Sequence, residues 1–93
     1  MKAKFLVVIE RGKNNFSAYS PDLPGCIATG SSVESTLNEI RSAISFHLEG
    51  MVENGEDLPI PIGLNSYVLE TEEISVDDIL TSVEVEMPEF ALA

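Results

Sequence analysis

The sequence predicts an α+β domain in which a three-stranded antiparallel meander is followed by one long amphipathic helix and then by one or two further strands. Three observations predict this order. Strand-like stretches separated by turn residues fill residues 3–30, and apolar residues recur with a helical period over 31–55. Polar and apolar residues alternate strictly at 82–87, as in a strand. With 93 residues, 44% of them apolar and 23% charged, the chain has the size and composition of one folded domain with a modest core.

The first two strands are predicted to form a hairpin. Residues 3–10, AKFLVVIE, are rich in β-branched and aromatic side chains. Their continuous apolar run is typical of a strand that is central in a sheet or covered on both faces. The following RGKNN contains a glycine and two asparagines, which tolerate a positive φ. FSAYS, residues 16–20, then alternates between two faces and is expected to run back as the second strand.

The stretch YSPDLPGC, residues 19–26, predicts a strand stop followed by a turn. Pro21 has no N–H to donate to a sheet, so the second strand ends or lies at an edge there. Pro24 fixes φ near about −65° and Gly25 tolerates a positive φ, which are the requirements of the two central positions of a type II turn. The chain therefore reverses, and CIATG, residues 26–30, is expected to form a short third strand.

The strongest pattern in the sequence is the helix predicted over residues 31–55. Ser31 followed by Glu34 fits a capping box, and Gly55 suits the left-handed position that often follows a helix. Apolar residues recur every three or four positions, at Val33, Leu37, Ile40, Ile44, Leu48 and Met51. This apolar stripe is expected to cover one face of the sheet.

Beyond the helix the patterns are shorter. EDLPIPIG, residues 56–63, is expected to be a stiff connector because its two prolines remove hydrogen-bond donors and favour extended backbone. SYVLE (66–70) is interpreted as a strand, SVDDIL (75–80) as a short helical turn capped by Ser75, and SVEVEM (82–87) as another strand. Either strand could be the fourth strand of the core sheet. We expect one domain over residues 1–93, with its core at about 3–70 and an acidic extension at about 71–93.

A right-handed crossover after the helix would place the next strand beside the first strand and parallel to it, in the spatial order third, second, first, fourth. The helix would then cover one face of the sheet and leave the other face without a layer. Apolar side chains of that face would need another surface to pack against; they are Leu6, Val8, Tyr19 and Ile27, or their alternates. Self-association or a partner would supply that surface, so a homo-oligomer is expected.

Charge is distributed unevenly along the chain. Residues 1–48 hold all five basic residues and four acidic ones, whereas 49–93 hold twelve acidic residues and no Lys or Arg, which gives a net charge of −11. A field of this sign repels phosphate backbones and attracts basic proteins. The alternative is that the acidity only keeps a small protein soluble. No apolar run approaches the roughly 20 residues of a membrane span and no signal peptide is recognisable, so we expect a cytoplasmic protein without membrane contacts.

The residues predict no catalytic, cofactor or metal site. Cys26 and His47 are the single representatives of their types, which excludes an internal disulfide and disfavours a metal site built from them. A two-metal nuclease needs several carboxylates that converge from strand interiors. The only acidic residue in the first three predicted strands is Glu10, and it lies at a strand end. We therefore expect that the protein is not an enzyme.

The order of these elements resembles a known family. The runs FSAYSPDLPGCIATGSS, IRSAISFHLEG and ENGEDLPIP resemble the HicB-like antitoxins of bacterial toxin–antitoxin pairs, over roughly residues 4–62. The resemblance implies a partial RNase H-like fold without the catalytic carboxylates. It also implies a partner, a small basic HicA-like toxin that cleaves mRNA and whose active histidine the antitoxin covers. An acidic surface would favour such a partner.

The chain departs from the family pattern after the sheet. Many HicB-like antitoxins continue into a ribbon-helix-helix or helix-turn-helix module that binds DNA, but residues 64–93 contain no basic residue. Such a segment cannot neutralise phosphates, so direct DNA binding is not expected. The acidic ending could be an edge strand, a dimer-forming arm or a segment that enters the toxin's RNA site.

The leading hypothesis is an antitoxin that binds and neutralises a small basic ribonuclease toxin. The alternative is an orphan module that homo-oligomerises and acts as a structural or regulatory protein without a toxin. Candidate partner contacts are Tyr19, Asp22, Leu23, Glu84 and Glu86. Each also has a plainer interpretation, because aspartate is a common turn former, tyrosine and leucine suit a core, and alternating glutamates usually form a solvated strand face.

Overall fold

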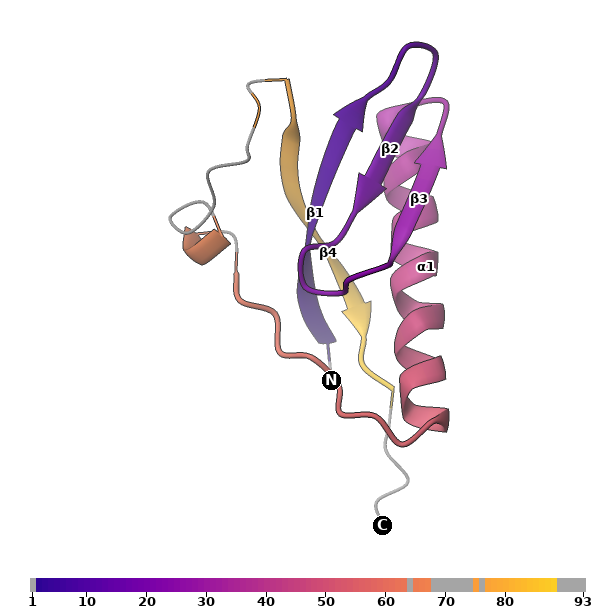
Figure 1. Ribbon diagram of the computed structural model, residues 1–93, viewed down its shortest axis with the longest axis vertical. Coiled ribbons are helices and arrows are strands. Elements are labelled where there is room, and N and C mark those ends of the chain that lie inside the picture. Colours follow the sequence, from indigo (N-terminus) through magenta and orange to yellow (C-terminus); the bar gives the residue numbers. More distant parts are fainter. Residues whose placement is uncertain (1, 64, 68–74, 76, 89–93) are drawn as a thin grey trace.

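Four strands and one long helix form the described part of the computed structural model, which covers residues 2–63, 65–67, 75 and 77–88. The elements are β1 (Lys2–Arg11), β2 (Phe16–Tyr19), β3 (Ile27–Gly30), α1 (Val33–Glu53) and β4 (Ile79–Glu86). The strands form one sheet in the order β3-β2-β1-β4, and each neighbouring pair is antiparallel (Figure 1). The predicted α+β class, with a meander, one long helix and a later strand, is confirmed.

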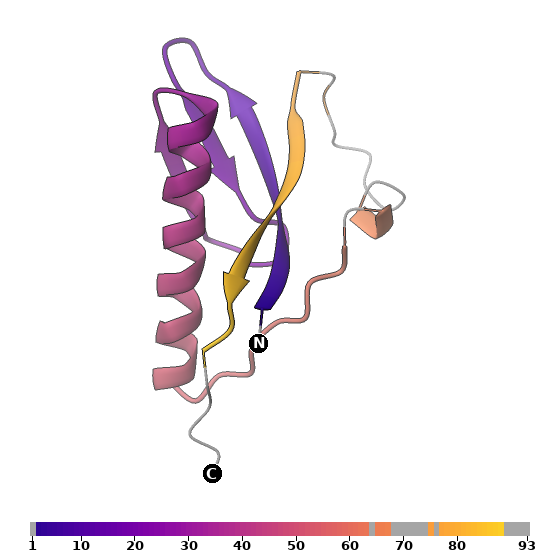
Figure 2. The ribbon, with the colours of Figure 1, turned by 180° about the vertical axis from the view of Figure 1, so that it is seen from behind.

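The core lies between α1 and one face of the sheet (Figure 2). Three helix residues of the predicted stripe, Ile40, Ile44 and Leu48, are fully buried. The sheet and the turn contribute the other buried members, which are Phe5, Val7, Ile9, Ala18, Leu23, Cys26, Val83 and Val85. Fully burying one side chain of this size contributes about 1.5–3 kcal/mol, so the stripe holds α1 on the sheet.

The turn between β2 and β3 has the predicted type II form. Gly25 has a φ of 86°, and the Cys26 N–H donates to the Leu23 carbonyl oxygen at 3.1 Å. Pro24 and Gly25 are therefore the two central residues of the turn, as their conformational preferences require. The turn places Leu23 and Cys26 in the core.

α1 begins one residue later than predicted. Ser32, rather than Ser31, is the N-cap: its Oγ accepts a hydrogen bond from the Ser35 N–H at 3.0 Å. The Ser35 hydroxyl in turn accepts from the Ser32 N–H at 3.1 Å, which completes a reciprocal capping box. The predicted partner, Glu34, is displaced because a serine three residues after the second serine can make the same pair of bonds.

A close approach between β3 and the first turn of α1 leaves no room for a side chain at Gly30. A Cβ there would lie 2.7 Å from the Thr36 backbone nitrogen and 2.5 Å from the Thr36 Oγ1. We expect Gly30→Ala to lower the free energy of unfolding by about 1–3 kcal/mol, because β3 and α1 would have to separate. Urea denaturation measures the change.

Gly50→Ala is the control for this prediction. Gly50 lies within α1, and a Cβ at that position meets nothing within 4 Å. Alanine there should raise the free energy of unfolding by about 0.5–1 kcal/mol through helix propensity alone. Equal losses of stability in the two variants would contradict the steric argument for Gly30.

The end of α1 directs the chain to the other side of the sheet. Gly55 has a φ of 71°, and the N–H groups of Gly55 and Glu56 donate to the carbonyl oxygens of Val52 and Met51. These two bonds form a Schellman motif, and Gly55 takes the left-handed position that the sequence predicted for it. Residues 56–63, which we call the strap, then pass the N-terminal end of β1 and rise along the side of the sheet opposite α1 (Figures 1 and 2).

β4 runs antiparallel to β1, which corrects the predicted parallel arrangement. The register pairs Lys2 with Glu86 and Ile9 with Ile79. The prediction relied on a right-handed crossover that passes from the helix directly into the next strand. Instead the strap runs along the side of the sheet opposite α1, and β4 lies beside β1 in the opposite direction (Figure 1).

The strand predicted over 66–70 is wrong in its described part, since residues 65–67 form a helical turn; 68–70 lie outside the described residues. The sheet is completed by the later candidate strand, which begins at Ile79 rather than at residue 82. The helical turn predicted over 75–80 is shorter than expected. Within it the Asp78 N–H donates to the Ser75 carbonyl oxygen at 3.1 Å, and β4 starts at the next residue.

The sheet face opposite α1, which we call the strap face, is better covered than predicted. Leu6 and Val8 belong to this face but are each only 2% exposed. The strap and the helical turn at 65–67 lie on this side of the sheet, where Ile62 bonds to Asp22 and Tyr67 to Tyr19. Tyr19 is half-buried, whereas Ile27, in the edge strand β3, keeps 66% of its surface exposed.

Candidate protein-interaction surface

The strap face combines apolar, aromatic and charged side chains. The strand register places on it the residues that alternate with those of the core: Lys2, Lys4, Leu6, Val8, Glu10, Ser17, Tyr19, Ile27, Thr29, Leu80, Ser82, Glu84 and Glu86. Above them the strap and the helical turn at 65–67 add a second layer. This face brings the predicted candidates Tyr19, Glu84 and Glu86 onto one side of the sheet, while Asp22 and Leu23 lie in the turn at its margin.

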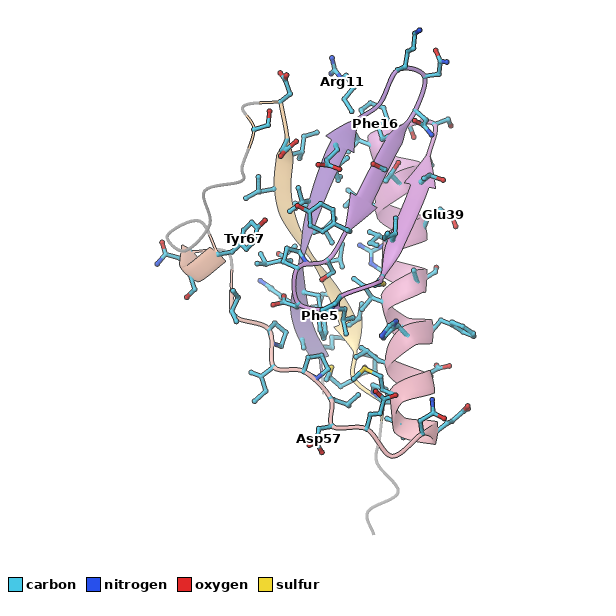
Figure 3. All side chains as sticks on the ribbon, in the orientation of Figure 1. Phe5, Arg11, Phe16, Glu39, Asp57 and Tyr67 are labelled. Carbon is cyan, nitrogen blue, oxygen red and sulfur yellow. The ribbon has the colours of Figure 1, made fainter. Side chains whose placement is uncertain are left out.

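Tyr19 links the sheet to the helical turn. Its side chain is hydrogen-bonded to that of Tyr67, which points from the helical turn toward the strands (Figure 3). Burial, first of all, and then this hydrogen bond raise the pKa of Tyr19 well above its ordinary value; the electrostatic effects of Tyr67, Glu10 and Asp78 act in the same direction. Tyr19 therefore stays neutral and holds two distant segments together.

The raised pKa predicts a loss of stability at alkaline pH. Folded Tyr19 holds its proton more tightly than the unfolded chain does, so its stabilising effect is complete below about pH 10 and is lost as the pH rises above that value. We expect the free energy of unfolding to fall more steeply above about pH 10 in the wild type than in Tyr19→Phe. Urea denaturation at stepped pH measures both slopes, and equal slopes would contradict the assignment.

Asp22 connects three parts of the chain. Its Oδ2 accepts a hydrogen bond from the Leu6 N–H at 3.0 Å, and its Oδ1 accepts one from the Ile62 N–H at 3.1 Å. β2 ends at Tyr19, so the carboxylate satisfies an N–H of β1 at a point that β2 does not reach. The same carboxylate fixes the strap, which makes Asp22 a positioning residue of the strap face.

Leu23 lies in the core and is 2% exposed. Leu23 is the first residue of the type II turn, and its side chain packs in the core. In this conformation it is not available to a partner. Any contact that the residue makes with a partner would require the turn to open.

Glu84 and Glu86 lie near basic groups of β1. Lys2 Nζ is 3.9 Å from Glu84 Oε1, and the register places Lys4 directly opposite Glu84. The pKa of Glu86 is lowered by a hydrogen bond to the amino terminus of the chain, by the charge of that group and by Lys2. These ion pairs are exposed and contribute little to stability, but they offset much of the acidic charge at this end of the sheet.

The comparison with known families decides what kind of protein this is. The family model described as "HicB_like antitoxin of bacterial toxin-antitoxin system" matches residues 5–91, nearly the whole chain. The chain belongs to this HicB-like antitoxin family.

A curated relative matches most of the HicB-like chain. It is 33% identical over 81 residues to an uncharacterized 14.9 kDa protein from the rep-hol intergenic region of Haemophilus phage HP1 (strain HP1c1), over 87% of this chain and 59% of that protein. The chain thus spans little more than half the length of this curated relative.

Two solved structures share the fold of the HicB-like chain. The N-terminal domain of the Burkholderia pseudomallei antitoxin HicB superposes with a TM-score of 0.76 at 21% identity, covering 91% of this chain and all of that one. A chain of the HicA3 and HicB3 toxin–antitoxin complex superposes with a TM-score of 0.71 at 22% identity, covering 94% of this chain and all of that one.

Sequence patterns missed the apolar side chains that the HicB-like chain exposes on its strap. Ile60 is 87% exposed and Ile62 is 50% exposed. The signal that could have found them is the alternation Pro59-Ile60-Pro61-Ile62. Two prolines keep this stretch out of a helix or a central strand, so the isoleucine that follows each proline is poorly placed to enter the core.

The described residues include His, Cys, Asp and Glu side chains of the kinds that can ligate a metal ion. Among them, no group of three or more His, Cys, Asp and Glu is placed to hold a metal ion, and no helix is long and apolar enough to cross a membrane. Cys26 is buried, and burial raises the pKa of its thiol above its ordinary value.

Proposed function

We propose that this HicB-like chain is an antitoxin that binds a small basic HicA-like toxin and neutralises it by covering the toxin's active site. The observation that carries the proposal is membership of the HicB-like antitoxin family over residues 5–91. The likeness to a chain of a HicA3 and HicB3 complex supports it further. In this proposal the chain acts by binding in the cytoplasm and catalyses no reaction.

The charge of the chain fits a basic partner. Its net charge is −11, and residues 49–93 carry no Lys or Arg to oppose their acidic side chains. Such a field speeds the encounter with a basic toxin and competes with the RNA that the toxin would otherwise bind. For the same reason we assign no DNA binding to residues 64–93.

Co-expression tests the proposed function. The protein to test as the toxin is any short basic protein, with a single histidine, that a gene next to this one encodes. We expect its expression alone to stop bacterial growth, and expression with this chain to restore growth and to yield a complex on size-exclusion chromatography. The proposal fails if the chain neither restores growth nor elutes with the toxin candidate.

The role of charge gives a separate prediction. We expect the association rate with the toxin to fall as the salt concentration rises from about 50 to about 300 mM, because exposed charges are screened beyond about 8 Å at physiological ionic strength. Stopped-flow fluorescence measures the rate. A rate that does not change with salt would mean that the acidity serves solubility only.

A second candidate function is self-association of a module without a toxin, and β3 favours it. This edge strand exposes Ile27, and no charged residue lies between Asp22 and Glu34 to repel a second acidic chain. Sedimentation analysis of the wild type and of Ile27→Lys tests it. An oligomer that Ile27→Lys dissociates supports the homo-oligomer, and a monomeric wild type excludes it.

A further inference from the structure

The strap presents two isoleucines to solvent in a fixed geometry. Ile60 is 87% exposed and Ile62 is 50% exposed, although Leu58, two residues earlier, packs against the core. Ile60 and Ile62 are two of the five large apolar residues that are exposed in the described part of the chain, and they are the two that lie close together in sequence on one segment. Neighbouring exposed apolar residues of this kind mark an interaction site.

The strap is held at both ends. At its start, the Schellman motif ties Glu56 to the last turn of α1. Near its end, the Ile62 N–H donates to Asp22, and the Tyr67 N–H donates to the Gly63 carbonyl oxygen at 3.2 Å as the chain turns into the helical turn. Pro59 and Pro61 restrict the backbone between these points. The strap is therefore already ordered before any partner arrives, which lowers the entropy lost on binding.

The charges beside the isoleucines identify the class of partner. Glu53, Glu56 and Asp57 are all exposed, and Asp57 points away from the sheet (Figure 3). No Lys or Arg follows Arg41 in the sequence. A second copy of this acidic chain would be repelled here, whereas a basic protein would be attracted.

We propose that the strap is a docking segment: Ile60 and Ile62 enter an apolar groove of a basic protein while Glu56 and Asp57 meet basic side chains at the rim of that groove. The proposal rests on the proposed function, and the toxin is the basic protein in question. Apolar anchors surrounded by charged groups are the usual composition of a strong contact at a protein interface. Asp22 contributes by holding the strap in position and makes no contact of its own with the partner.

The test compares the double variant Ile60→Ser/Ile62→Ser with Phe46→Ser. Phe46 is 78% exposed but lies on α1, on the opposite side of the sheet from the strap. We expect the double variant to raise the Kd for the toxin by about 10-fold to 100-fold, and Phe46→Ser to leave it unchanged. Isothermal titration calorimetry measures the Kd, and thermal melts followed by circular dichroism establish that all three proteins are folded.

The outcomes separate this proposal from the proposed function. A wild type that binds no toxin overturns the proposed function, and the docking proposal with it. A wild type that binds, with a double variant that binds equally well, overturns only the docking proposal. An unchanged Kd together with an oligomeric wild type that the double variant makes monomeric would assign the strap to self-association instead.

The charged part of the proposal has its own control. Glu56→Gln/Asp57→Asn and Glu39→Gln/Glu49→Gln each remove two exposed negative charges, one pair beside the strap isoleucines and the other on α1. We expect the first pair to slow toxin association by about 2-fold to 10-fold at low salt and the second pair to slow it less. Equal reductions of the association rate by the two double variants would show that only the net charge of the chain matters. The contact of Glu56 and Asp57 with basic side chains at the groove rim would then be wrong.

Discussion

Leu23→Ala is expected to lower the free energy of unfolding by about 2–5 kcal/mol, the range for removing a buried leucine and leaving a cavity. Leu23 is 2% exposed and belongs to the core, beneath the type II turn. Its loss should loosen the turn and the neighbouring Cys26 together. Urea denaturation followed by circular dichroism measures the change.

Ile27→Ala is the control for Leu23→Ala. Both residues are apolar and lie at or beside the same turn, but Ile27 is 66% exposed. Its replacement should change the free energy of unfolding by no more than about 0.5 kcal/mol. If Leu23→Ala instead kept full stability and lost only toxin binding, Leu23 would be a partner contact as the sequence first indicated.

Asp22→Ala is the second large effect that we expect. The substitution leaves the Leu6 N–H without its acceptor and frees the Ile62 N–H of the strap. The free energy of unfolding should fall by about 1–3 kcal/mol, because the Leu6 N–H lies inside the sheet and Asp22 is the acceptor that it has on the side away from β4. Hydrogen exchange should show faster exchange at both amides than in the wild type.

Two further variants test this interpretation of Asp22. Asp22→Asn keeps one carbonyl oxygen as an acceptor, so it can hold only one of the two amides and should lose less stability than Asp22→Ala. Asp57→Ala removes the same charge from an exposed position and should have little effect. Unchanged exchange at Leu6 and Ile62 in Asp22→Ala would contradict the role assigned to the carboxylate.

Local patterns predicted the elements whose form depends on neighbouring residues. Pro24 and Gly25 specify a type II turn by their own conformational limits, and the apolar stripe of α1 specifies its buried face. The family resemblance rests on the same local stretches. The fold class followed from these elements because a meander and one covering helix allow few arrangements.

Contacts between distant residues could not be predicted in the same way. Asp22 bonds to Leu6 and Ile62, which lie 16 and 40 positions away in the sequence. Nothing in its immediate surroundings distinguishes it from an ordinary turn aspartate. The direction of β4 was missed for a related reason, since a proline-rich connector can be recognised as stiff without revealing the side of the sheet on which it runs.

The candidate surface was predicted in part. The strand register brings Tyr19, Glu84 and Glu86 to one face, but it also sets Glu84 near Lys2 and opposite Lys4. Composition alone counts such glutamates as free negative charge. Composition could not predict that the strap isoleucines are exposed either, because their exposure depends on the path that the prolines impose on the chain.

The pairing of β1 with β4 joins the first and last described strands of the chain, from Lys2 opposite Glu86 to Ile9 opposite Ile79. During synthesis, β1 must therefore wait until residues 79–86 have left the ribosome before its second neighbour exists. Until then the apolar edge of a central strand is open, which favours slow folding and leaves the nascent chain exposed to aggregation.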